Sequence, residues 1–317
     1  MSDPGDRVMG AAITTGEGGI LLPFLLRPLA ALEWVDRSDL WDATGPRWGY
    51  TGPFCWGDGA GLADRFWDEW TTWARVQHVV SSFTRLSLFT DDLLSWPGPR
   101  RLIQENVVRS TDLSPEELWQ SVEHKVRKNV TRARREGVVV ERVEPDEGAL
   151  VEFLQVYGHT MQRRSAAAEF RYDLPFLVRL MEHLRTASAL FLARADGRTV
   201  SAEIVLHSPR HAYSFIGGTL EEAFPIRPND LLKFEIFLWA REQGLADVVL
   251  GGGPTPGDGI FRYKRSFAPQ GVVPFYAGEM ILDQDLYASL VEQRRHHDSA
   301  LGAAWAPTPG FFPLYRS

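Results

Sequence analysis

Residues 189–216, with the sequence ALFLARADGRTVSAEIVLHSPRHAYSFI, decide the fold class of this chain. The stretch holds three runs rich in Val, Leu, Ile and Phe, which favour β-strands. Asp196-Gly197 lies between the first two runs and is typical of a tight hairpin turn. The three predicted strands are Ala189–Ala193, Thr199–His207 and His211–Ile216. A predicted helix over 229–243 and a buried strand at Val248–Leu250 follow. This order predicts an α/β fold (an α+β mixed sheet) with helices on the faces of the sheet.

Further elements are predicted on both sides of this stretch. Apolar residues between Leu62 and Trp73 recur at helical spacing. Ser114 before Pro115, with acids in the first turn, opens a long helix, and Gly137 ends it. The predicted helices cover 61–75, 115–135, 146–162, 173–187 and 284–298, and the predicted strands cover 76–88, Val138–Val140, Val272–Phe275 and Glu279–Leu282.

Composition excludes several classes of protein. The 317 residues are enough for about two domains, and 44 % hydrophobic with 24 % charged residues excludes a largely disordered chain. The net charge of −7 excludes a protein that is basic throughout, although a local basic site is compatible with it. One cysteine, Cys55, excludes an intramolecular disulfide, and no spacing of histidines indicates a metal site.

The N-terminal region has no sign of a targeting sequence or a membrane span. Residues 1–19 lack the basic n-region of a signal peptide. The apolar stretch Ile20–Leu32 is interrupted by Pro23, Arg27 and Pro28, and it is shorter than the ~20 apolar residues of a membrane span. We therefore expect a cytoplasmic protein. The sequence does not indicate an oligomeric state.

Lysine is rare in this chain. The 34 basic residues include four lysines, which are Lys125, Lys128, Lys233 and Lys264. The excess of arginine is typical of a GC-rich genome and says little about function. The four lysines are more informative about function, because each is retained although the composition strongly favours arginine.

Three segments carry motifs. Residues 125–138, KVRKNVTRARREGV, match the pattern K-x-R-x-N-(I/V)-x-(R/K)-A…G-V, and residues 48–53, WGYTGP, are close to Y-G-Y-x-G-P. Residues 250–253, LGGG, with residues 259–267, GIFRYKRSF, match L-G-G-G…(L/I)-F-x-(F/Y)-K-x-x-F. In this order the three segments resemble the FemAB-like (Fem-type) acyltransferases of the GNAT superfamily. The resemblance covers residues from about 45 to about 285.

This resemblance implies tandem GNAT-like domains. We expect an N-terminal Trp-rich GNAT-like half over 1–114, a second GNAT-like transferase domain over 115–282, and a C-terminal helix and tail over 283–317 that packs back on the first half. Members of the family transfer an amino acid from aminoacyl-tRNA to an amine, in peptidoglycan bridges or in natural products. The helical arm of some bridge ligases has no counterpart here, and Trp48 replaces the first tyrosine of its motif. These departures weaken the case for a cell-wall acceptor more than the case for the chemistry.

Two residues are the predicted catalytic groups. The resemblance implicates Lys264 in the transfer step, where an ammonium could stabilise an oxyanion or hold a tRNA phosphate. The alternative is a solvated lysine on a short helix. Glu203 lies on a predicted strand where GNAT enzymes often place a carboxylate base, and it could deprotonate the attacking ammonium. The alternative is an exposed strand residue.

The predicted helix over 115–135 carries a dense run of positive charge. Six basic residues fall within eleven positions with no acid among them: Lys125, Arg127, Lys128, Arg132, Arg134 and Arg135. The spacing puts Lys125, Lys128, Arg132 and Arg135 on one face. Such a patch predicts salt-dependent contact with the backbone of an RNA, and the alternative is an ordinary solvated face.

The stretch Ile226–Lys233 occupies the place of the pyrophosphate-binding turn of a GNAT enzyme. Acetyl-CoA enzymes use glycines there, so that backbone N–H groups approach the phosphates. No glycine lies between 219 and 243 in this chain, and Asp230 would repel pyrophosphate. The sequence therefore argues against acetyl-CoA and for another acyl donor. Lys233 could still meet a phosphate of the donor, and otherwise it is a solvated helix residue.

The remaining candidates are assigned to substrate binding. They are Arg163, Arg164, Tyr213, Ser214, Tyr263 and Trp48. The two arginines could bind an acidic acceptor or lie at the surface. The glycine-rich residues 251–259 match neither a Walker loop nor G-x-G-x-x-G, and they line an acceptor channel or form a flexible connection.

The sequence favours one function over two alternatives. The favoured function is an aminoacyltransferase that forms an amide between an amino acid from aminoacyl-tRNA and a small-molecule amine acceptor, with no cofactor and no metal. The second is an acyl-CoA-dependent N-acyltransferase. The third is a degenerate GNAT fold that only binds RNA or a protein partner. The amino acid, the tRNA and the acceptor depend on pocket shape, which the sequence does not fix.

Overall fold

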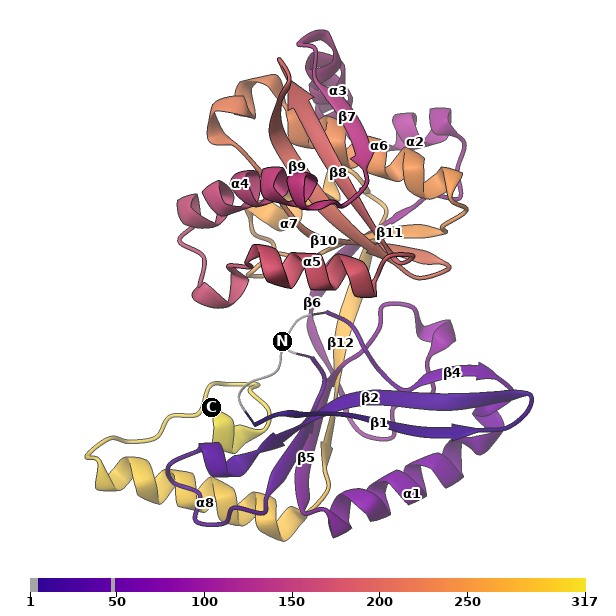
Figure 1. The fold of residues 1–317 in the computed structure, drawn as a ribbon. Coiled ribbons are helices and arrows are strands. Elements are labelled where there is room, and N and C mark those ends of the chain that lie inside the picture. The colour runs from indigo at the N-terminus through magenta and orange to yellow at the C-terminus, as the bar shows by residue number, and fades with distance from the viewer. Residues whose placement is uncertain (1–4, 47–48) are drawn as a thin grey trace. The chain divides into compact units, whose positions relative to one another are not determined.

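The computed structural model describes residues 5–46 and 49–317, which form two compact units. Unit 1 contains residues 1–104 and 274–317, and unit 2 contains residues 105–273. The chain passes from unit 1 to unit 2 within β6 (Arg100–Ser110) and returns within β12 (Val272–Ile281) (Figure 1). Each unit is therefore completed by a strand that begins or ends in the other.

Unit 2 is a mixed sheet in the strand order β6-β11-β10-β9-β8-β7. The strands β10 and β11 run parallel, and the other neighbouring strands are antiparallel. Its strands are β7 (Val139–Val143), β8 (Ser188–Ala195), β9 (Arg198–His207), β10 (His211–Thr219) and β11 (Asp247–Gly251). Its helices are α2 (Pro115–Ser121), α3 (His124–Arg135), α4 (Glu147–Arg163), α5 (Leu174–His183), α6 (Pro228–Glu242) and α7 (Gly259–Arg265).

Both faces of this sheet are covered by helices (Figure 1). Side chains alternate between the faces along each strand. Phe191 and Ala193 of β8 therefore pack in a core with α3 and α6, whereas Leu190 and Leu192 pack with α4 and α5. Helix α6 is buried on most sides, and its ten buried residues include the charged Asp230 and Lys233.

Unit 1 has the sheet order β1-β2-β3-β5-β12, and β4 also pairs with β2. Strands β3 and β5 are parallel, and α1 connects them, just as α6 connects the parallel strands β10 and β11 of unit 2. Helix α8 packs on β5, and its Leu290 shares a core with Tyr315. The elements of unit 1 are β1 (Arg7–Thr14), β2 (Gly18–Pro28), β3 (Trp41–Thr44), β4 (Phe54–Gly57), α1 (Ala63–Val76), β5 (Val79–Arg85) and α8 (Gln284–Ala300).

The predicted mixed α/β fold is confirmed, and the hairpin of β8 and β9 turns at Asp196-Gly197, where both residues have positive φ. Several predicted elements were wrong in extent. The helix over 115–135 is two helices, because the buried Val122 and the half-buried Glu123 have extended backbones, and the Glu123 N–H donates to the carbonyl of Ser266. The strand over 76–88 is shorter, because α1 continues to Val76. The two short strands over 272–282 are one strand, β12.

Candidate functional site

The candidate site of unit 2 lies where β10 and β11 separate. The two strands pair from His211 with Asp247 to Tyr213 with Val249, and β10 then continues unpaired with β11 as far as Thr219. A bulge between Ser214 and Ile216 bends β10 at this point. Ser214 therefore stands at the mouth of a gap between two parallel strands, which is a common place for a ligand in a mixed sheet.

A buried ion pair lies against Ser214 at this point. Lys233 of α6 donates to both carboxylate oxygens of Glu203 on β9, with Nζ to Oε1 at 2.6 Å and Nζ to Oε2 at 2.5 Å. Lys233 also donates to Oγ of Ser214 at 2.6 Å, and Ser214 donates to Oε1 of Glu203 at 2.7 Å. The side chains of Lys233 and Glu203 are only 9 % and 3 % exposed. The three groups satisfy one another, which is the condition for burying charge.

Local sequence explains how the pair forms. Lys233 interrupts the apolar run Leu231, Leu232 and Phe234, and all four residues are buried because α6 packs against both the sheet and α3. Glu203 faces Gly217 across the β9–β10 pairing. A Cβ at Gly217 would lie 2.8 Å from the carbonyl oxygen of Ala202 and 3.3 Å from the Glu203 side chain, so only glycine fits here.

Lys264 belongs to the same group of charges. Asp258 begins α7 by accepting from the N–H of Phe261 at 2.7 Å, and one helical turn later Lys264 donates to the carbonyl of Gly252 at 2.6 Å. Burial, with a smaller contribution from the positive charge of Lys233, lowers the pKa of Lys264 to about 8. Lys264 therefore exchanges protons near neutral pH, where an ordinary lysine would not.

A second polar chain connects α3, α6 and α7 beside the ion pair. Asn129 of α3 donates to Asp230 at 3.0 Å, and Asn229 donates to the hydroxyl of Tyr263 at 2.7 Å. Burial raises the pKa of Asp230 and raises that of Tyr263 well above its usual value. Tyr263 therefore remains a neutral hydroxyl throughout the physiological range, so it serves as a hydrogen-bonding group rather than a base.

The turn before α6 is built without glycine. Arg227 adopts the left-handed conformation, with φ 60° and ψ 40°, and Pro228 opens the helix. Pro228 has no N–H to offer, and the carboxyl of Asp230 lies in the same first turn. This helix terminus is therefore less suited to a pyrophosphate than one with free N–H groups and no acid.

The basic helix α3 divides into exposed and tethered residues. Arg127 turns inward and donates to the carbonyl of Gln120 at 2.9 Å, so it holds the C-terminus of α2. Arg134 pairs with Glu235 at 2.9 Å. Lys128 is exposed and has no ion pair within the described ranges. Three more basic residues pair at the surface with flanking acids: Lys125 with Glu123, and Arg132 and Arg135 with Glu136.

Three other predicted substrate-binding residues lie on β10 or at the end of α4, and a fourth lies outside the described residues. Arg163 donates to the carbonyl of Thr219 at 3.1 Å and lies over the ring of Phe224, and Arg164 is exposed just beyond α4. Tyr213 is the last residue of β10 that pairs with β11. Trp48 lies outside the described residues.

The structure also brings in residues that the sequence did not single out as site residues. Asn129 and Asp230 bridge α3 and α6, and Arg109 of β6 is 4 % exposed and donates to Oγ of Ser121 at 2.6 Å. A weak signal existed for Asp230, because a carboxylate within an otherwise apolar helix needs a partner. Across the described residues, no cluster of three or more His, Cys, Asp or Glu could hold a metal, and no helix is long and apolar enough to cross a membrane.

Comparison with known proteins identifies the class of fold. Residues 120–265 match the family model described as an acetyltransferase (GNAT) domain. The crystal structure of FemX has a TM-score of 0.67 at 15 % identity, and the alignment covers 90 % of each chain. L-PGS from Bacillus licheniformis has a TM-score of 0.56 at 14 % identity, covering 89 % of this chain and 86 % of that chain. No protein of curated function matches this chain.

These matches agree with the repeated strand order of the two units. The chain has a mixed α/β fold of the tandem GNAT kind, and its fold is similar to that of FemX. Residues 120–265, matched to the GNAT domain, lie within unit 2 and include Glu203, Ser214, Lys233 and Lys264. The candidate site therefore lies within the residues that match the GNAT domain.

Proposed function

We propose that the protein is an N-acyltransferase that moves an aminoacyl group from aminoacyl-tRNA to an amine. The acceptor is a natural-product or cell-wall precursor. The observation that carries the proposal is the group of Lys264, Lys233, Glu203 and Ser214 beside the gap between β10 and β11. It provides a lysine with a pKa of about 8, held beside a buried ion pair.

In the proposed reaction, the amine nitrogen of the acceptor attacks the ester carbonyl of the donor. A C–N bond forms, and the C–O bond to the tRNA ribose breaks. Neutral Lys264 takes the proton that the amine loses, and its ammonium then stabilises the oxyanion and returns the proton to the departing ribose hydroxyl. A pKa near the working pH suits both steps, since both protonation states of Lys264 are then accessible.

Glu203 acts through Lys233 in this proposal. Its carboxylate is bonded by Lys233 and Ser214 and is almost fully buried, so it does not face an incoming ammonium. The bond instead fixes the position of the Lys233 ammonium. Burial and the charge of Lys233 lower the pKa of Lys264, and the charge of Glu203 opposes part of that effect. Glu203 and Lys233 are thus positioning residues, and Lys264 is the catalytic residue.

Two features support aminoacyl-tRNA as the donor. The turn before α6 has no glycine, has Pro228 at its first position and has Asp230 in its first turn, which disfavours a pyrophosphate there. The exposed Lys128 and its basic neighbours on α3 form a surface suited to RNA phosphates. An aminoacyl ester is already activated, so the protein needs mainly to position it and move a proton.

A specific observation also favours a second candidate, an acyl-CoA-dependent N-acyltransferase. The family model that matches residues 120–265 describes acetyltransferases. Calorimetry with acetyl-CoA separates the two candidates, since tight binding of acetyl-CoA favours the second. An RNA- or partner-binding module without activity is the remaining alternative.

The test incubates the full chain with radiolabelled aminoacyl-tRNA and a panel of amines. We expect label to pass to an amine, and we expect pretreatment of the tRNA with ribonuclease to abolish transfer. Transfer that survives ribonuclease contradicts the requirement for tRNA. RNA binding with no transfer to any amine, from either tRNA or acyl-CoA, favours the binding module.

A further inference from the structure

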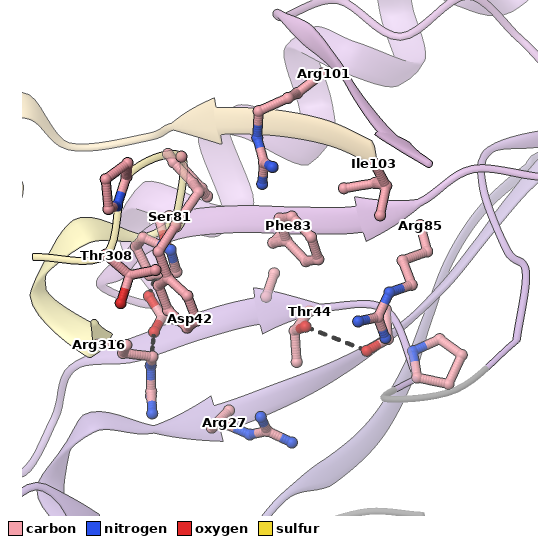
Figure 2. A pocket seen from close by; sticks show the side chains of 18 residues that line it. Arg27, Asp42, Thr44, Ser81, Phe83, Arg85, Arg101, Ile103, Thr308 and Arg316 are labelled. Atoms are coloured by element: carbon pink, nitrogen blue, oxygen red, sulfur yellow. Dashed lines mark hydrogen bonds and ion pairs between the residues drawn. The ribbon is translucent and has the colours of Figure 1, made fainter. Parts of the chain in front are cut away.

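Unit 1 contains a cavity that plays no part in the proposed chemistry of unit 2. The cavity has a volume of about 420 Å³ and lies on one face of the unit 1 sheet, where residues 308–313 and Arg316 form one wall (Figure 2). The strands β2, β3, β5 and β6 contribute the side chains of its floor.

The strand pattern places polar side chains on this face. Leu26 of β2 and Ala43 of β3 pack in the core beneath α1. Their neighbours Arg27 and Asp42 must therefore point to the opposite face. The register aligns Arg27 with Asp42, and Asp42 with Ser81 of β5, so the polar residues form a row across three strands.

Arginine dominates the lining of the cavity. Among the residues that the structure describes, four arginines line it, Arg27, Arg85, Arg101 and Arg316, against one carboxylate, that of Asp42. Asp42 is already engaged, because it accepts from Ser81 at 2.8 Å and from Arg316 at 2.5 Å. The cavity therefore offers donors and positive charge, and it has little acceptor capacity left for a cation.

Carboxylates behind the lining hold two of these guanidinium groups in place. Nε and Nη2 of Arg27 donate to Asp6 at 3.1 and 2.9 Å. Nε of Arg101 donates to Glu279 at 2.6 Å. Neither Asp6 nor Glu279 lines the cavity. This arrangement fixes the direction of both guanidinium groups before a ligand arrives, which lowers the entropy cost of binding.

Of the four arginines, Arg101 gives the clearest indication of the ligand that the cavity binds. Within the part of the chain that the structure describes, its Nε carries the bond to Glu279 and its two Nη groups have no protein acceptor. Figure 2 shows its guanidinium directed toward the cavity, on the opposite side of Phe83 from Arg27. Two adjacent N–H groups with a fixed direction match the oxygens of a carboxylate or phosphate.

One part of the wall is aromatic. Phe83 of β5 stacks with Phe312, with ring centroids 6.4 Å apart and planes at 27°. Ile103 adds a further apolar surface. Apolar surfaces beside the arginines strengthen charge–charge attraction, because they lower the local dielectric constant.

We propose that this cavity of unit 1 is a binding site for a small organic anion with at least two negative charges, carried by phosphate or carboxylate groups. Arg101 is its specificity-determining residue, and Arg27 and Arg85 surround the rest of the anion. The proposal is independent of acyl transfer, since every residue involved belongs to unit 1 and binding is measured without turnover.

The experiment titrates the full chain with inorganic pyrophosphate and with citrate by calorimetry at low salt. We expect saturable binding of at least one anion, and the tighter of the two identifies phosphate or carboxylate as the preferred group. Arg101→Gln should weaken binding at least tenfold, and Arg101→Lys should fall between Arg101→Gln and the wild type. Arg65→Gln on α1 is the matched control, because Arg65 also pairs with a glutamate but lies outside the cavity.

Hydrogen exchange provides a second readout that does not depend on the variants. Bound anion should slow exchange in residues 308–316 and β5 of the wild-type protein. No binding of either anion overturns the proposal, as does affinity that survives Arg101→Gln or an equal loss in Arg65→Gln. Protection confined to α3, or a loss of binding in Lys128→Gln alone, also overturns it, because the anion then occupies unit 2.

Discussion

Replacing Lys233 with methionine tests whether the buried ion pair is organised as described. The substitution keeps most of the side-chain volume but removes the cation that bonds both oxygens of Glu203 and the hydroxyl of Ser214. Glu203, 3 % exposed, is left as a buried carboxylate without a counter-charge. Removing one partner of a buried pair costs about 3–5 kcal/mol, so Lys233→Met should destabilise unit 2 by that amount.

The matched control removes the whole polar group. In the triple variant Glu203→Leu, Ser214→Ala and Lys233→Met, no buried charge or hydroxyl of the group is left without a partner. Replacing a buried ion pair by apolar residues of similar volume is often nearly neutral, so we expect the triple variant to lie within about 2 kcal/mol of the wild type. The triple variant should thus be more stable than the single variant, although it carries more substitutions.

The assay must report on unit 2 alone, because a chain with two units need not unfold in one step. Hydrogen exchange of peptides from β9 and α6 at increasing urea gives the free energy of opening of those elements. If Lys233→Met lowers the free energy of opening by less than about 1 kcal/mol, the reasoning is refuted, because so small a loss means that the Glu203 carboxylate is solvated. A triple variant less stable than the single variant would refute it as well.

Further predictions concern catalysis, the pH dependence of stability, RNA binding and the C-terminal segment. Because neutral Lys264 is the proposed base and its pKa is about 8, single-turnover transfer should rise with pH up to about 8 and then level off. Lys264→Ala should abolish most of the rate, and an unchanged rate would exclude the role. The pKa of Lys264 is lower folded than unfolded, so unit 2 binds fewer protons when folded, and its stability should increase between about pH 8 and the ordinary lysine pKa near 10.5. Lys125→Glu with Lys128→Glu should weaken tRNA binding and reduce the slope of log affinity against log salt by about 2, whereas Arg134→Gln should change the slope by at most about 1. If the double reversal leaves the slope unchanged, α3 is not the RNA site. Asp42→Ala removes the acceptor shared by the buried hydroxyls of Ser81 and Tyr315, which keep only their bond to each other, and it removes the carboxylate that pairs with Arg316. Unit 1 should therefore lose about 3 kcal/mol, and residues 308–317 should become sensitive to protease. Equal proteolysis of the variant and the wild type would contradict that account.

Local signals in the sequence predicted most of unit 2. Strand propensity and the Asp196-Gly197 turn located β8 and β9, and helix periodicity located α4 and α6. These elements are regular and buried on both faces of the sheet, so their sequences carry the pattern that their packing needs. The elements of the first 60 residues were harder to predict. Pro23 lies within β2 opposite Gly10 of β1, and a proline normally argues against a strand.

The site could be predicted as a set of residues but not as an arrangement. Motif resemblance selected Lys264, and the position on a strand selected Glu203. The bond between Glu203 and Lys233 joins residues 30 positions apart, and no local rule connects them. The sequence did indicate that Lys233 needs a partner. A lysine within the apolar run Leu231 to Phe234 would be buried on a helix, and a buried lysine requires an acid. Which acid depends on the register of β9 and β10, which only the folded sheet defines.

The interleaved course of the chain has a consequence for its biosynthesis. Unit 2 is a continuous segment, so all of it is synthesised before residues 274–317 of unit 1. Tyr315, which is fully buried beside Val80 and Leu29, and β12, which pairs with β5, arrive only after that. During translation the GNAT-type domain can therefore finish folding while its partner unit still lacks a strand and part of its core. The nascent first segment must avoid aggregation throughout that interval, with the edge of β5 and its apolar contacts still uncovered.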